Sequence, residues 1–159
     1  MAPVQAVSYP ALAALYLLST QATWSGTPTL TVDWLSADAN PAVAVLQYPG
    51  GPPARALAGV PYSASVRLQV QSRADISQLK LAMGNAWAAY QVLEAVTDVT
   101  VTPTQMATVL SDVATYFPDD CHILDISPYG VPTLVTREQD RERPVVTFDL
   151  DCVFDMRQA

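Results

Sequence analysis

Residues 145–155 read VVTFDLDCVFD and alternate apolar with polar side chains over almost their whole length. The apolar positions are Val146, Phe148, Leu150, Cys152 and Phe154, and the polar positions between and after them include Thr147, Asp149, Asp151 and Asp155. Successive side chains of a strand point to opposite faces of a sheet. The pattern therefore predicts a strand with one face in the core and the other on water or on a partner.

A second stretch, residues 65–73, has the same alternation and leads directly into a helical pattern. Its apolar side chains are Val66, Leu68 and Val70, and the side chains between and after them are Arg67, Gln69 and Gln71. Apolar residues then recur at steps of three and four from Ile76 to Leu93, and Asp75 with Gln78 fits a capping box. We expect a strand followed by a long amphipathic helix that packs on the sheet.

Shorter patterns fill the rest of the chain. An apolar run over residues 11–18, after Pro10, predicts a buried helix, and Thr102 with Gln105 predicts a short capped helix that ends near Pro118. Further strands are predicted over residues 30–34, 43–48, 123–126 and 133–137. The sequence thus predicts one α+β domain over residues 1–159, with a mixed, mainly antiparallel sheet of about five strands flanked by two or three helices.

Composition and charge limit the function. The chain has 159 residues, half of them apolar, and a net charge of -7. Such a surface repels phosphate, which argues against a basic nucleic-acid-binding groove. The run 11–18 is shorter than the ~20 residues of a membrane span, and no basic residue precedes Arg55, as a secretory leader would require. We expect a protein that stays soluble in the cytoplasm where it is made and binds no membrane.

Cysteine and histidine offer one candidate for catalysis. The only histidine, His122, directly follows Cys121. Adjacent residues of a strand point to opposite faces, so this thiol and this imidazole should not meet as nucleophile and base. We expect Cys121 and Cys152 to be buried thiols and His122 to be structural or to contact a partner. The sequence favours a protein that is no enzyme and holds no cofactor.

The carboxylates Asp149, Asp151 and Asp155 should project together from the polar face of the last strand. They lack the compact loop that wraps calcium or magnesium, so we expect no metal site. A plain solvated face and a specific electrostatic role both remain open.

Two polar loops are candidate contacts. One comprises Pro49, Gly50, Gly51 and Pro52, which predict a turn, because no Lys-Ser/Thr follows as in a phosphate loop. The other is the reversal 137–143, which carries Arg137, Glu138, Arg141 and Arg143 among charges of both signs. A solvated hairpin tip and an intersubunit ion pair both fit this reversal.

Taken together, these features resemble the tail terminator proteins of long-tailed bacteriophages, which are also called minor capsid or tail completion proteins. The resemblance covers the order of elements over roughly residues 8–155, and individual residues over 49–52, 67–73 and 132–154. Residues 97–118 depart from it and look like an inserted helix, and residues 135–143 lack the glycines expected there.

The resemblance implies a subunit of a homo-hexameric ring in the virion neck, assembled in the host cytoplasm. Such a ring stops growth of the tail tube at its head-proximal end and joins the tail to the head connector. Tube protein and connector would be its partners, and DNA would pass through its lumen without sequence-specific binding. The two loops would then contact neighbours, and the three carboxylates would line the lumen. A head-to-tail stopper or neck protein, a small ligand-binding domain and an enzyme subunit completed by a partner are the alternatives.

Overall fold

The structure is a computed structural model that describes residues 4–5, 8–37, 40–49, 54–55, 61–137 and 143–158. The strands are β1 (Val4–Gln5), β2 (Thr29–Val32), β3 (Ala42–Pro49), β4 (Ala54–Arg55), β5 (Pro61–Arg73), β6 (Thr97–Val101), β7 (Cys121–Pro128), β8 (Thr133–Arg137), β9 (Pro144–Asp155) and β10 (Arg157–Gln158). The helices are α1 (Pro10–Gln21), α2 (Leu79–Glu94), α3 (Pro103–Ala107) and α4 (Ser111–Ala114).

Eight strands form one mixed sheet, in the order β2-β3-β5-β9-β7-β6, with β4 paired to β5 and β8 paired to β9. Only β2 and β3 run parallel, and the other pairs of this sheet are antiparallel. Near the chain ends, β1 and β10 pair as a separate antiparallel ribbon.

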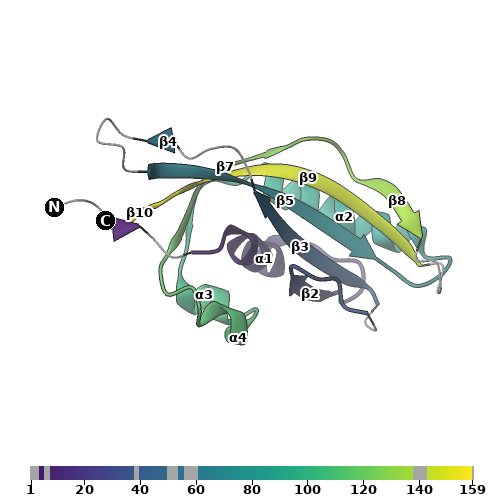
Figure 1. The fold of residues 1–159 in the computed structure, drawn as a ribbon. Coiled ribbons are helices and arrows are strands. Elements are labelled where there is room, and N and C mark those ends of the chain that lie inside the picture. Colours follow the sequence, from purple (N-terminus) through teal and green to yellow (C-terminus); the bar gives the residue numbers. More distant parts are fainter. Residues whose placement is uncertain are drawn as a thin grey trace.

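The main sheet is organised around one central pair of long strands. Strands β5 and β9 pair at its centre, from Ser63 opposite Asp155 to Arg73 opposite Val145. On the outer edge of β5 lie β3 and β4 one after the other, and β7 and β8 lie in the same way on the outer edge of β9. Strands β4 and β8 therefore lie near opposite ends of the central pair (Figure 1).

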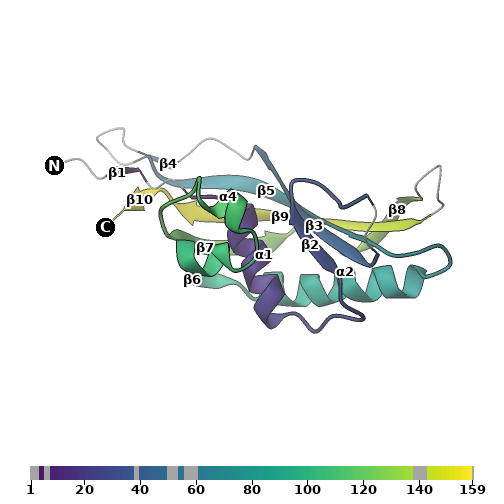
Figure 2. The same cartoon turned by 90° about the horizontal axis from the view of Figure 1, so that it is seen from below.

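Helices cover one face of the sheet. Figure 1 shows α1 and α3 beneath the strands, and Figure 2, from below, shows α1 in front of them. Helix α2 packs on β5 and β9. Helix α1 is buried on nearly every side, as its all-apolar sequence predicts. Together with the inward side chains of the sheet it forms one core, which includes Leu12, Leu15, Leu18, Val43, Val45, Leu68, Val70, Ala86, Leu93, Phe148, Leu150 and Cys152.

The alternation predicted for the two central strands is confirmed. Leu68, Val70, Phe148, Leu150 and Cys152 are buried toward the helices, whereas the residues between them are half-buried or exposed. The sheet therefore has a second face that no helix covers within the described residues. A single α+β domain with a mixed sheet is also as expected.

The predicted number of about five strands was too low. Strand β6 falls where an inserted helical segment was expected, because Thr97 to Val101 has too few apolar residues to reveal a strand that is buried only at its end. Strands β1, β4 and β10 have two residues each, too few for a periodic pattern.

One of the two predicted capping boxes is present in the structure. The capping box of Thr102 and Gln105 is confirmed, with both hydrogen bonds present. The one predicted for α2 is wrong: the helix begins at Leu79, and its N-cap Gln78 makes no side-chain cap bond. Asp75 instead accepts a hydrogen bond from Asn40 Nδ2 at 2.8 Å, so tertiary structure uses the carboxylate that local sequence assigned to the helix. The predicted second helix is also broken, into α3 and α4.

Candidate interaction surface

The uncovered side of the sheet is the first candidate surface, and we call it the open face. It is formed by side chains of β5, β7 and β9 that point away from the helices, namely Arg67, Gln69, Gln71, Asp125, Ser127, Thr147, Asp149, Asp151, Val153 and Asp155. The predicted trio of aspartates thus lies on one face, as expected. Four carboxylates against one guanidinium make this set of residues acidic.

Hydrogen bonds fix part of this face. Gln69 Nε2 donates to Asp149 Oδ1 at 3.1 Å, and Gln71 Nε2 donates to Gln69 Oε1 at 2.9 Å. Arg67 lies opposite Asp151 in the ladder, and its guanidinium stacks over the ring of Tyr129 at 4.3 Å from the ring centroid. The polar groups are held in an ordered row by the pairing of β5 with β9.

One end of the open face is closed by the segment between β2 and β3. Arg73 donates through Nε to Asn40 Oδ1 at 3.0 Å and through Nη2 to the carbonyl of Ser36. Arg143 donates through Nη1 to the carbonyl oxygen of Ala37 at 2.9 Å and is only 5% exposed. Arg143 was expected to contact a neighbouring subunit, but the structure places its side chain in the interior, where it holds this segment on the sheet.

The other predicted contact residues are placed as follows. Pro49 is the last residue of β3 and Arg137 the last of β8. Gly50, Gly51, Pro52, Glu138 and Arg141 lie outside the described residues. Pro49 and Arg137 themselves lie on strands at opposite edges of the β5–β9 pair.

The cysteine and the histidine point to opposite faces, as predicted. Cys121 and Cys152 are both buried free thiols, and burial raises the pKa of Cys121 to about 12. Burial, and next the neighbouring Cys121, raise the pKa of Cys152 as well. His122 is half-exposed instead, with Nε2 at 2.6 Å from Asp98 Oδ1 and Nδ1 at 3.8 Å from Asp155 Oδ2. The imidazole is bracketed by carboxylates and has no thiol beside it.

A second surface feature lies along β8 and was not predicted. Strand β8 pairs with β9 alone, so its other edge has no strand partner among the described residues. A shift in register leaves Val135 as an extra residue, 64% exposed, and Val131 is 55% exposed. Beside this edge is a hollow of about 280 Å³, lined by Tyr129, Gly130, Val131, Thr133, Val135, Thr147, Phe148 and Asp149. We call it the β8 hollow.

One feature of the sequence indicates the exposed edge of β8. Leu134 and Val135 are adjacent and apolar, which breaks the alternation of a strand with one buried face. The interruption between β7 and β8 agrees with the separate strands predicted over residues 123–126 and 133–137. Their common place on one edge of β9 was not predicted, and there Tyr129 N donates to Asp149 O at 2.9 Å.

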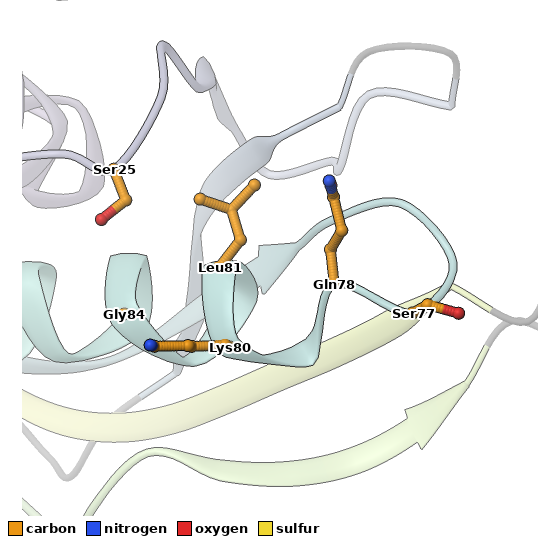
Figure 3. Close-up of a pocket in the computed structure, with 6 residues that line it drawn as sticks. All are labelled: Ser25, Ser77, Gln78, Lys80, Leu81 and Gly84. Atoms are coloured by element: carbon orange, nitrogen blue, oxygen red, sulfur yellow. The ribbon is translucent and has the colours of Figure 1, made fainter.

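A separate hollow of about 570 Å³ lies between the α1–β2 connection and the start of α2 (Figure 3). It is lined by Ser25, Ser77, Gln78, Lys80, Leu81 and Gly84. Ser25 is fixed there by buried Asn85, which accepts from Ser25 N at 2.8 Å and donates to Ser25 O at 3.1 Å. Lys80 is the one charged residue of this lining, so the hollow offers no acid–base pair.

Comparison with known proteins adds no relative: no family model matches the sequence, and no curated protein matches it significantly. Within the described ranges, no group of three or more His, Cys, Asp or Glu side chains is placed to hold a metal ion. No helix in the described part of the chain is long and apolar enough to cross a membrane.

Proposed function

We propose that this protein is a structural component of a tailed-phage virion, where six copies form a ring at the head-proximal end of the tail tube. The ring ends polymerisation of the tube and joins the tail to the head connector. In this role the chain is no enzyme and holds no cofactor. The sequence resemblance over roughly residues 8–155 is the starting point of the proposal.

The acidic open face is the observation that carries it. The core is complete on the helix side of the sheet, so the opposite face is available for a role outside the subunit. Its carboxylates stand in a row on β9, with Asp149 and Asp151 two residues apart on the same side. A channel lined with such groups repels phosphate and lets DNA pass without adhering to the wall.

The range of electrostatic interactions in salt solution is compatible with such a role. Exposed charges act over about one Debye length, ~8 Å at physiological ionic strength. A single subunit would influence DNA only weakly over such a range, but sixfold repetition surrounds the duplex with the same carboxylates. A basic face would do the opposite and retain the genome in transit.

Immunoelectron microscopy tests the assigned position. Antibodies raised against the purified chain should label intact particles at the junction of head and tail. Labelling confined to the capsid surface or to the distal tail tip would contradict the proposal.

Particles made without this protein separate the two neck functions. Loss of a terminator should leave tubes of excessive and variable length that do not join heads. Tubes of normal length that fail to join heads would instead indicate the stopper or neck function.

A further inference from the structure

The β8 hollow has the size and lining of a socket for one side chain. Its volume of about 280 Å³ is below the ~300–1,000 Å³ of usual small-molecule sites. Its walls combine apolar Val131, Val135 and Phe148 with the carboxylate of Asp149. An apolar body with one polar hydrogen-bond donor fits such a lining, which describes a tyrosine or a tryptophan.

Asp149 has the capacity to take that donor. Its Oδ1 accepts from Gln69 Nε2 at 3.1 Å, and an ionised carboxylate offers about four acceptor positions. The hollow is lined by Thr133 and Val135 of β8, whose other backbone edge has no strand partner among the described residues. Neither a charged residue nor a proline interrupts residues 133–136. Edges without such protection readily bind another chain.

A matching side chain stands at the opposite side of the same sheet. Trp34 follows β2, at the far end of the strand order from β8, and is 52% exposed. Its backbone is held in place, since Asp33 N donates to Val45 O at 2.9 Å and Thr31 Oγ1 donates to the carbonyl of Trp34. A fixed, exposed tryptophan loses little freedom on binding, and tryptophan is enriched among the residues that dominate interface energies.

We infer that Trp34 of one copy inserts into the β8 hollow of the next copy, with the indole Nε1–H donating to Asp149. Because the two elements lie on opposite sides of one sheet, the contact is head to tail. Such a contact closes into a ring when the rotation permits it, whereas a twofold contact would stop at a dimer. The inference rests on the proposed ring and names the surfaces that would form its subunit interface.

Two lesions and two matched controls test the contact. Trp34→Ala removes the inserted side chain, and Val135→Glu places a charge at the rim of the hollow. Tyr116→Ala and Ile76→Glu alter an aromatic residue and an aliphatic residue that are likewise exposed, at 76% and 55%, but do not line the β8 hollow. Melting temperatures should change little in all four, because the altered side chains are exposed.

Sedimentation velocity of the full-length chain from about 1 µM to about 1 mM is the readout. We expect the wild type and both controls to associate alike, and each lesion to weaken association by at least about thirtyfold, as loss of an interface anchor does. An equimolar mixture of the two lesion variants retains one intact contact per pair. It should form a one-to-one dimer and nothing larger.

The other outcomes have distinct meanings. Wild-type hexamers that survive both lesions would overturn the Trp34 contact and leave the proposed ring standing. A dimer abolished by Val135→Glu and unaffected by Trp34→Ala would show a twofold contact through β8, against both the inference and the ring. A wild type that remains monomeric at about 1 mM would overturn the inference, and labelling of the virion neck would then decide the proposed function separately.

Discussion

Replacement of Arg143 by alanine separates a role in the fold from a role in subunit contact. The guanidinium is 5% exposed and donates to the carbonyl oxygen of Ala37 at 2.9 Å. Alanine removes this hydrogen bond and leaves a space where the long side chain was packed. The segment between β2 and β3 loses one of its anchors on the sheet.

The expected loss of stability follows from these contacts. A hydrogen bond that involves a charged group contributes ~1.5–3 kcal/mol, and loss of the packing of the long buried side chain adds to the cost. We therefore expect the free energy of unfolding to fall by about 3 kcal/mol. For a chain of this length that corresponds to a fall in melting temperature of roughly 6–12 °C.

Urea unfolding followed by circular dichroism measures this change, with Arg67→Ala as the matched control. Arg67 is an exposed arginine on the same face and stacks on Tyr129. Its removal should cost no more than about 1 kcal/mol. If Arg143→Ala lowered the free energy of unfolding by less than the control did and instead failed to assemble, the interior role deduced for Arg143 would be refuted.

Three further predictions concern the open face and the titratable groups. Asp151→Lys should preserve folding and slow DNA ejection, more strongly at low salt because exposed charges are screened; normal ejection from particles that contain the substituted ring would count against the lumen assignment. Because burial raises the pKa of Cys121 from 9.0 to about 12 and raises that of Cys152, unfolding releases protons at alkaline pH. Stability should therefore be full below about pH 9 and fall by up to ~1.4 kcal/mol per pH unit for each thiol as the pH rises toward 12. Urea midpoints at pH 8 and 10.5 measure this fall, and Cys121→Ala should reduce the slope between them; an unchanged slope would contradict burial of that thiol. His122→Gln should leave fold and assembly intact, with a loss of about 1 kcal/mol or less for its exposed contact with Asp98; loss of an enzymatic activity in a folded, assembled variant would contradict the structural role.

Local periodicity predicted those elements whose two sides face different environments. Strands β5 and β9 carry core residues on one face and polar residues on the other, so their alternation is complete in the sequence. Helix α1 was recognisable for the opposite reason, since it is apolar all round and buried all round. The capping box at Thr102 is a contact within four residues and needs no tertiary structure.

Tertiary contacts decided the features that the sequence did not show. Asp75 matches a helix cap but bonds to Asn40, thirty-five positions away. Arg143 lies in a charged reversal typical of a surface, but its side chain is buried and donates to the distant Ala37 carbonyl. The break between β7 and β8 was predicted, but the β8 hollow also depends on the pairing of both strands with β9, which local periodicity does not encode.

Electron cryomicroscopy of the assembled protein tests the central claim most directly. The account predicts a closed ring of six copies with a central channel, in which the β9 carboxylates Asp151 and Asp155 face the lumen. A closed assembly of another symmetry, or a sixfold ring in which Asp151 and Asp155 point outward or are buried against a neighbour, would contradict it.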